Sequence, residues 1–190
     1  KKVWIIKNNY QRTLTIASEL EALCIEAGFV FDEAHPDIVI SVGGDGTMLA
    51  ALHYYETQLD TVRFIGLHTG HLGFYTDFQE HELEKLIEAI KHETPEEAFR
   101  YPLLKVKIQF TDGEVKTHLA LNESIIKRAS KTLVADVEIS DFLFEKFRGD
   151  GLAVSTPTGS TAYNKSIGGA VMHPRVKAFQ VTEVASLNNL

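Results

Sequence analysis

The strongest constraint on the fold is a glycine-rich segment, 43–47 (GGDGT), that separates a predicted buried strand from a predicted helix. The strand is the apolar run 37–42, and the helix is the apolar helical pattern 48–55. Open α/β sheets bind ligands in this setting, at the carboxyl ends of their strands. Because the amides of such a loop and the N-terminus of the following helix can face a phosphate, the segment predicts a site for a phosphate-bearing ligand.

The loop alone leaves a structural interpretation open. Asp45 could serve only as a helix N-cap, and the glycines could form only a tight turn. The segment contains neither G-x-x-x-x-G-K-[ST] nor G-x-G-x-x-G, so neither a P-loop nor the standard dinucleotide fingerprint explains it.

The first half of the chain alternates short apolar runs with amphipathic stretches. One amphipathic stretch ends at Gly28, which is a typical helix stop. This alternation predicts an α/β domain with a mostly parallel sheet over residues 1–99. The expected strands are 3–7, 29–31, 37–42 and 63–67, and the expected helices are 11–27, 48–55 and 79–92.

The second half has a different pattern. Runs 103–110 and 115–121 flank the turn signal Thr111-Asp112-Gly113, and runs 134–139 and 143–147 flank Ser140-Asp141, which predicts two antiparallel hairpins. A Gly/Ser/Thr-rich stretch follows over 149–161. We therefore expect a mainly-β domain over residues 100–190.

Composition excludes several partners. The 190 residues carry 19 Lys and Arg against 26 Asp and Glu, a net charge of −7, so broad attraction to nucleic acid or anionic membranes is not expected. The single cysteine, Cys24, lies at helical spacing from Ala17 and Leu20 and is expected to be a buried small hydrophobe. No apolar run has the length of a membrane span or a signal peptide, which leads us to expect a cytoplasmic protein.

Five segments together resemble one kinase family. GGDGT occurs in the superfamily of NAD kinases, diacylglycerol and sphingosine kinases and, more distantly, phosphofructokinases. Residues 121–123 (LNE), and 149–152 (GDGL) leading into 155–163, resemble the Asn-Glu motif and the second glycine-rich motif of NAD kinases, in the family's order. Residues 64–75 (FIGLHTGHLGFY) and 168–174 (GGAVMHP) are also similar to this family. The sequence thus resembles an NAD kinase of the Gram-positive bacterial type.

The resemblance implies a fold and an activity. The fold is a Rossmann-like α/β domain followed by a mainly-β domain. Because the family pattern continues beyond Leu190, the resemblance also implies a chain truncated at the C-terminus, with the second domain incomplete. The activity is transfer of phosphate from ATP or polyphosphate to the 2′-OH of the adenosine ribose of NAD, giving NADP. A divalent cation such as Mg²⁺ would arrive with ATP, no protein metal site is expected, and family members are commonly homotetramers.

The resemblance also implies site residues. Asp45 corresponds to the catalytic acid/base of the family. The residues expected to bind NAD and the phosphates are Gly43, Gly44, Gly46, Asn122, Glu123, Arg148, Asp150, Thr161, Ala162, Tyr163, Asn164, Lys165, Ser166 and Ala185.

Several of these residues have structural alternatives. Asn122 and Glu123 can hydrogen-bond a base edge and ribose hydroxyls, or can be solvated groups at a strand end. Arg148 could approach the pyrophosphate, or could be solvated. Tyr163 could face an aromatic ring of the dinucleotide, or simply pack.

Two further features have mainly structural interpretations. Ser160 or Thr161 could cap a short helix that runs toward Ile167. His68 and His71 lack a nearby cysteine or acidic partner for zinc, so we interpret their loop as structural or ligand-lining.

Two other functions remain open from the sequence. A diacylglycerol- or sphingosine-type lipid kinase shares GGDGT but needs an apolar acceptor pocket. A non-catalytic NAD-binding module would bind NAD without phosphorylating it.

Overall fold

The computed structural model describes residues 1–70 and 72–187. His71 and the chain end at Leu190, both named above, lie outside the described residues. The chain divides into two compact units, Lys1–Phe99 and Arg100–Leu190. Each unit is described by itself.

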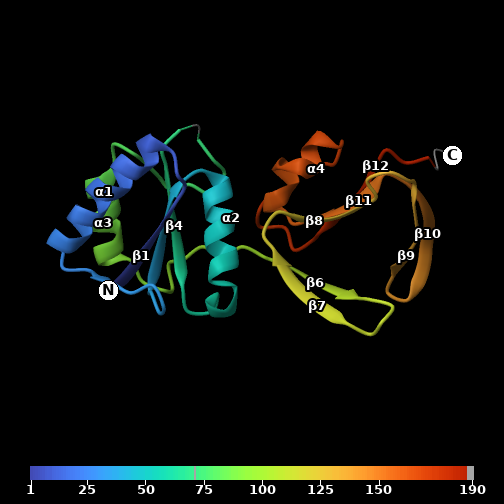
Figure 1. Ribbon diagram of the computed structural model, residues 1–190, viewed down its shortest axis with the longest axis horizontal. Helices are drawn as coiled ribbons and strands as arrows, with labels where there is room; N and C mark the ends of the chain where they lie inside the picture. Colours follow the sequence, from blue (N-terminus) through green and yellow to red (C-terminus); the bar gives the residue numbers. More distant parts are fainter. Residues whose placement is uncertain (71, 188–190) are drawn as a thin grey trace. The chain divides into compact units, whose positions relative to one another are not determined.

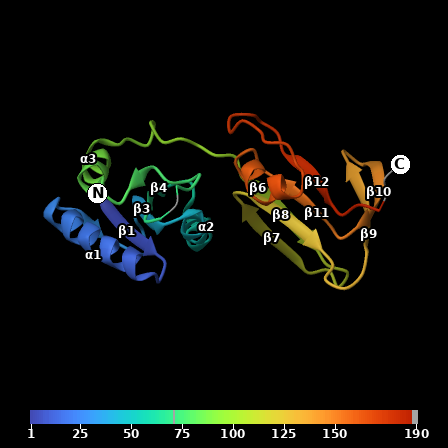
Figure 2. The ribbon, with the colours of Figure 1, turned by 90° about the horizontal axis from the view of Figure 1, so that it is seen from above.

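The first unit is built on a five-stranded sheet with the order β2-β1-β3-β4-β5, in which every pair is parallel (Figures 1 and 2). This confirms the α/β prediction. Its strands are β1 (Lys2–Lys7), β2 (Val30–Phe31), β3 (Ile38–Gly43), β4 (Arg63–His68) and β5 (Phe78–Gln79). Its helices are α1 (Gln11–Glu26), α2 (Asp45–Tyr54), α3 (Leu83–His92) and the short 3-10 helix η1 (Glu56–Gln58).

Successive side chains of each strand point to opposite faces of the sheet, so a hydrophobic core forms on each face. Ile38, Ile40 and Val42 of β3 are buried with apolar residues of α1 and α3. Val39, whose side chain points to the other face of the sheet, is buried with Ala51 of α2. Figure 1 shows the resulting layers, with α1 and α3 on one face of the sheet and α2 on the other. Both faces are therefore covered, as is typical of a parallel sheet.

Helix α1 has the spacing expected from the sequence. Its buried residues include Ala17, Leu20 and Cys24, all fully buried. The helix ends before Gly28, whose φ of 78° is one that glycine adopts without strain. Burial, with a smaller contribution from Glu21, raises the pKa of Cys24 to about 12.

Helix α3 begins later than expected, so the predicted start at residue 79 is wrong. Phe78 and Gln79 instead form β5 and pair with Leu67 and His68 of β4. The N–H of Gln79 donates to the Glu82 carboxylate at 3.0 Å, and Leu83 is the first helical residue. The pairing with β4 determines this boundary, and it is not visible in local periodicity.

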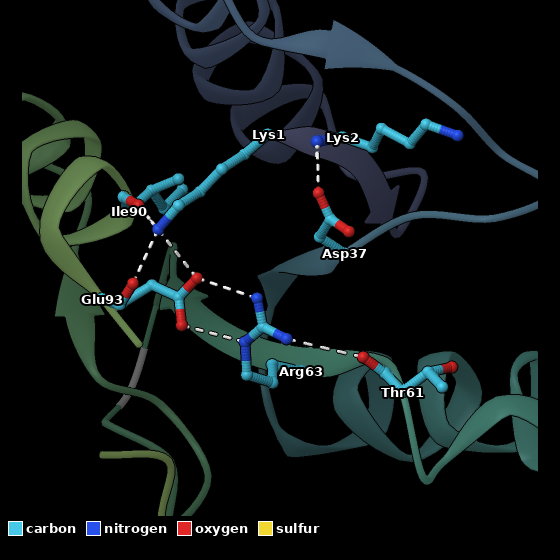
Figure 3. A network of polar contacts seen from close by, with 7 residues as sticks. All are labelled: Lys1, Lys2, Asp37, Thr61, Arg63, Ile90 and Glu93. Atoms are coloured by element: carbon cyan, nitrogen blue, oxygen red, sulfur yellow. Dashed lines mark hydrogen bonds and ion pairs between the residues drawn. The ribbon is translucent and has the colours of Figure 1, made fainter. Parts of the chain in front are cut away.

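A polar network joins three elements away from the glycine loop (Figure 3). The Glu93 carboxylate accepts hydrogen bonds from the Arg63 guanidinium, at 2.9 Å for both Nε and Nη2, and from Lys1 Nζ at 2.9 Å. Lys1 Nζ also donates to the Ile90 carbonyl at 2.6 Å. The network thus ties the end of α3 to β4 and to the residue before β1.

The second unit is mainly β, as expected. Both predicted hairpins are present, and Ser140 and Asp141 have φ values of 51° and 65°, as in a tight primed turn. A three-stranded antiparallel sheet of order β12-β11-β8 was not predicted. The elements of this unit are β6 (Leu104–Gln109), β7 (Val115–Ala120), β8 (Glu123–Lys127), β9 (Leu133–Ile139), β10 (Phe142–Gly149), β11 (Gly151–Ser155), the 3-10 helix η2 (Thr158–Thr161), α4 (Tyr163–Ser166) and β12 (Gln180–Val184).

Candidate active site

Asp45 lies where β3 ends and α2 begins. The N-cap residue of α2 is Gly44, which has no side chain to cap the helix, and Asp45 is the first helical residue. The Asp45 carboxylate instead accepts two backbone hydrogen bonds, from Phe74 N to Oδ2 and from Tyr75 N to Oδ1, each at 2.9 Å. The interpretation of Asp45 as only a helix cap is therefore wrong.

The glycines around Asp45 have different surroundings. A Cβ on Gly43 would overlap Thr47 Oγ1 and lie 2.8 Å from Asn8 Nδ2, so this position has no room for a side chain. At Gly44 and Gly46 a Cβ would meet nothing within 4 Å. The loop is thus packed at its strand end and open beside Asp45, where a ligand could approach the backbone.

His68 ends β4 and pairs in register with Gly43. Its side chain is 9% exposed, with Nδ1 at 3.2 Å from the Gly70 carbonyl and Nε2 buried without a hydrogen-bond partner.

Over residues 1–70 and 72–187, no group of three or more His, Cys, Asp or Glu could hold a metal ion. Within the same ranges, no helix is long and apolar enough to cross a membrane.

In the second unit, the two motifs that suggested NAD pack on each other. Thr156 N donates to the Asn122 carbonyl at 2.9 Å, and Thr156 Oγ1 donates to the Leu121 carbonyl at 2.5 Å. A Cβ on Gly159 would lie 2.5 Å from Asn122 Cα, so only glycine fits there. The second glycine-rich motif is thereby seated on the Asn-Glu motif.

Glu123 has unused hydrogen-bonding capacity. Burial raises the pKa of its carboxyl group, and Oε2 is buried without a partner. Ser155 lies opposite Glu123 in the β8–β11 ladder, and its fully buried Oγ also lacks a partner. Since buried polar atoms are normally hydrogen-bonded, these two neighbouring atoms are exceptions within the unit.

The short helix α4 does not begin as predicted. Its N-cap is Ala162, without a side-chain cap, so the expected cap by Ser160 or Thr161 is wrong. Ser160 Oγ donates to the Pro157 carbonyl at 2.6 Å and accepts from Met172 N at 2.8 Å. Because the Ser160 hydroxyl is hydrogen-bonded to Pro157 and Met172, it does not cap α4.

Tyr163 stands at the start of α4 beside a cation. Lys127 Nζ lies 3.3 Å from the Tyr163 hydroxyl and 5.5 Å from the ring centroid. Helix α4 also packs against β11, and the contact with Lys127 places Tyr163 at the C-terminal end of β8.

The Asn164 side chain has a structural position. It is fully buried, Nδ2 donates to the carbonyls of Ser160 and Ala170, and Oδ1 accepts from Thr182 Oγ1 at 2.7 Å. The neighbouring Thr161, Lys165 and Ser166 are exposed. The hydroxyls of Thr161 and Ser166 each donate to one backbone carbonyl but stay exposed, whereas the Asn164 side chain is buried with both of its polar atoms paired.

Arg148, Asp150 and Ala185 lie in one corner of the second unit. Asp150 N donates to the Val184 carbonyl at 2.9 Å, and Leu187 N donates to the Arg148 carbonyl at 2.7 Å. A Cβ on Gly149 would lie 2.8 Å from the Ala185 carbonyl oxygen. The side chains of Arg148 and Asp150 are exposed.

Family models match both halves of the chain. The ATP-NAD kinase N-terminal domain matches residues 7–94, and the ATP-NAD kinase C-terminal domain matches residues 121–189. The chain belongs to the ATP-NAD kinase family. The NAD kinase of Lactococcus lactis subsp. cremoris (strain SK11) is 60% identical over 190 residues, which are 100% of this chain and 70% of that protein. The NAD kinase of Lactobacillus acidophilus is 58% identical over 188 residues, 99% of this chain and 70% of that protein.

Two solved structures share the fold. The yeast NADH kinase complexed with NADH has a TM-score of 0.86 at 20% identity, covering 100% of this chain and 63% of that chain. An NAD kinase from Archaeoglobus fulgidus in complex with ATP has a TM-score of 0.73 at 22% identity, covering 100% of this chain and 74% of that chain. The chain therefore spans about two thirds to three quarters of these proteins.

Sequence reasoning missed some residues of the site. The segment 73–75 was noted only as part of a family-like run, although its amides bind the Asp45 carboxylate. Lys127 and Ser155 were missed because their partners, Tyr163 and Glu123, are distant in sequence. Gly73, directly before Phe74, was the only sequence feature that could have indicated a close approach of this backbone to another group.

Proposed function

We propose that this protein, as an NAD kinase, transfers the terminal phosphate of ATP to the 2′-OH of the adenosine ribose of NAD, with Asp45 as the general base. The observation that carries this role is the hydrogen-bonded Asp45 carboxylate at the open end of the glycine loop. The 2′-oxygen forms a bond to the γ-phosphorus while the bond to the β–γ bridging oxygen breaks and ADP leaves. The 2′-OH proton passes to Asp45.

Each unit contributes its own groups to this reaction. In the first unit, Gly43, Gly44 and Gly46 allow close backbone approach, and the N-terminus of α2 favours negative charge. In the second unit, the Glu123 carboxylate accepts hydrogen bonds from ribose hydroxyls, and Asn122 binds a base edge. The other NAD contacts come from Arg148, Asp150, Thr161, Ala162, Tyr163, Lys165, Ser166, Ala185 and the backbone of Asn164.

The cation would come with the nucleotide. Such a divalent ion would be held mainly by ATP phosphates, because Mg²⁺ is usually bound through substrate phosphates and few protein ligands. When bound, such an ion would neutralise charge on the phosphates. We further propose a cytoplasmic homotetramer that acts in NADP biosynthesis, with the oligomeric state to be measured by light scattering.

The decisive experiment is an assay of NADP formation from NAD, ATP and Mg²⁺, read by an NADP-specific dehydrogenase. It should be run on the 190-residue chain and on a chain extended to the length of its relatives. ATP-dependent NADP formation is the expected result. Phosphorylation of diacylglycerol or sphingosine without NADP would indicate a lipid kinase, and calorimetric NAD binding without turnover would indicate a binding module.

A further inference from the structure

The backbone segment 73–75, here called the carboxylate clamp, encloses one side of Asp45. We propose that the clamp is a positioning element of the reaction, which fixes the Asp45 carboxylate so that its free lone pairs face the acceptor hydroxyl. This role rests on the proposed function, because it assigns the clamp to the base of that reaction.

The hydrogen bonds of the clamp use only part of the carboxylate. Phe74 N binds Oδ2 and Tyr75 N binds Oδ1, each at 2.9 Å, so each oxygen accepts one backbone N–H. A carboxylate offers roughly four lone-pair sites. The clamp therefore fixes the orientation of the group and leaves capacity for a substrate proton.

Gly73 makes this close approach feasible. A Cβ at this position would overlap Asp45 Oδ1 and lie 2.9 Å from Cγ. Gly44 and Gly46, which flank Asp45 in sequence, have open space where a Cβ would be. The carboxylate is thus closed off on the side of Gly73 and approachable from the side of its own loop.

The clamp is in turn anchored on β4. A Cβ on Gly66 would overlap the Tyr75 carbonyl oxygen and lie 2.7 Å from Thr76 Cα, so the clamp rests directly on the strand. Asp77 N donates to the Gly66 carbonyl at 2.7 Å, and Gly66 N donates to Asp77 Oδ2 at 2.9 Å. Tyr75 is 7% exposed. An interior strand of the sheet therefore supports the segment that holds the base.

Precise placement of a general base has a large effect on rate. A misplacement of about 1 Å can lower a rate on the order of 10²-fold. Substitution of Gly73 would displace Asp45 while leaving the carboxylate itself in the protein.

The test is Gly73→Ala, compared with Gly70→Ala as the matched control. Gly70 is in the same connection, but a Cβ there would meet nothing within 4 Å. We expect Gly73→Ala to lower kcat about 10- to 100-fold, with the calorimetric Kd for NAD changed less than about threefold. Gly70→Ala should keep both values.

Two further comparisons separate positioning from a general loss of structure. In an Asp45→Asn background, Gly73→Ala should lower kcat no further, because the group on which it acts is gone. Asp77→Ala, which removes an anchor, should lower kcat about three- to tenfold, and Asp77→Asn, which retains an acceptor oxygen, should restore it.

The outcomes distinguish this role from the function on which it rests. A wild-type protein that makes no NADP overturns both. If wild type makes NADP but Gly73→Ala keeps its kcat, or loses it equally in the Asp45→Asn background, positioning by the clamp is overturned alone. Should Gly73→Ala fail to fold, equal kcat for Asp77→Ala and wild type would overturn it instead.

Discussion

Asp45 in the first unit and Glu123 in the second are carboxylates at the first residue of a helix and of a strand, respectively, and their surroundings are opposite. Both Asp45 oxygens accept backbone hydrogen bonds, whereas Glu123 Oε2 is buried without a partner. Under the proposed function, the first group moves a proton and the second binds hydroxyls. The difference indicates that the fold fixes the orientation of a reacting group and leaves a ligand-binding group incompletely paired.

The largest expected effect tests the reacting carboxylate. Asp45→Asn should lower kcat about 10²- to 10⁴-fold, the usual contribution of general-base catalysis, because the amide cannot take the proton. Calorimetry should find the Kd for NAD nearly unchanged. Turnover at the wild-type rate would remove Asp45 from its assigned role and leave the comparison without its first member.

A second effect concerns a fully paired group in the second unit. Asn164→Ala should lower the free energy of unfolding of this unit by about 2 kcal/mol, since one buried and two partly buried hydrogen bonds are lost. Hydrogen exchange at Ala153 and Val154 of β11 measures this. The control is Ser166→Ala, at an exposed hydroxyl, which should change the value by less than about 0.5 kcal/mol. Unchanged exchange in Asn164→Ala would contradict the structural role of that side chain.

Glu93 extends the comparison to a paired carboxylate far from the glycine loop in sequence. Burial alone would raise the pKa of Glu93, but hydrogen bonds from Arg63 and Lys1 bring it below its usual value. The charged form thus stabilises the fold above the usual pKa, and this contribution is lost as pH falls through the lowered pKa.

Glu93→Gln should accordingly cost about 1–2 kcal/mol at pH 7 and much less in acid. Urea unfolding followed by the fluorescence of Trp4, the single tryptophan, reports on the first unit. Glu88→Gln, at an exposed ion pair with Lys91 on the same helix, is the matched control and should leave the urea midpoint nearly unchanged. Equal losses in the two variants would mean that the network in Figure 3 adds nothing beyond a surface pair.

The smallest effect should have the opposite sign. Burial raises the pKa of Glu123, so its charged form lowers stability as pH rises above the usual value. Glu123→Gln should therefore stabilise the second unit by about 1 kcal/mol at pH 7, an advantage that disappears as pH falls through the raised pKa.

The same variant should weaken NAD binding, and Glu114→Gln, at an exposed carboxylate, should change neither property. Hydrogen exchange of β11 and calorimetry give the two values. A Glu123→Gln variant that is less stable at pH 7 would show that Oε2 has a partner in solution, and the contrast with Asp45 would then be lost.

Local signals predicted a large part of the fold. The hairpins follow from turn residues that need no distant partner, and the strands β1 to β4 and the helices α1 and α2 follow from apolar periodicity. Strand β11 lies in a Gly/Ser/Thr-rich stretch and was not predicted. Its Gly151 is needed because a Cβ there would lie 2.5 Å from the carbonyl oxygen of Ile126, a residue distant in sequence. Two-residue β5 is defined only by its pairing with β4.

The candidate site divides in the same way. Family resemblance suggested Asp45 and the NAD-binding positions, whose roles remain predictions. The partners of the Asp45 carboxylate lie 29 and 30 residues along the chain, and they are backbone amides, which no side-chain motif encodes. The buried state of Asn164 likewise depends on Thr182, in a strand that the sequence did not reveal.

The burial of Cys24 has a practical consequence for all of these measurements. It is the only cysteine, it is fully buried, and burial raises its pKa to about 12, so the thiolate that reacts with maleimides is scarcely formed in the native protein. A cysteine introduced on the surface would then take a spectroscopic label alone, with Cys24 left in place. The rate at which Cys24 itself is modified would measure how often α1 opens.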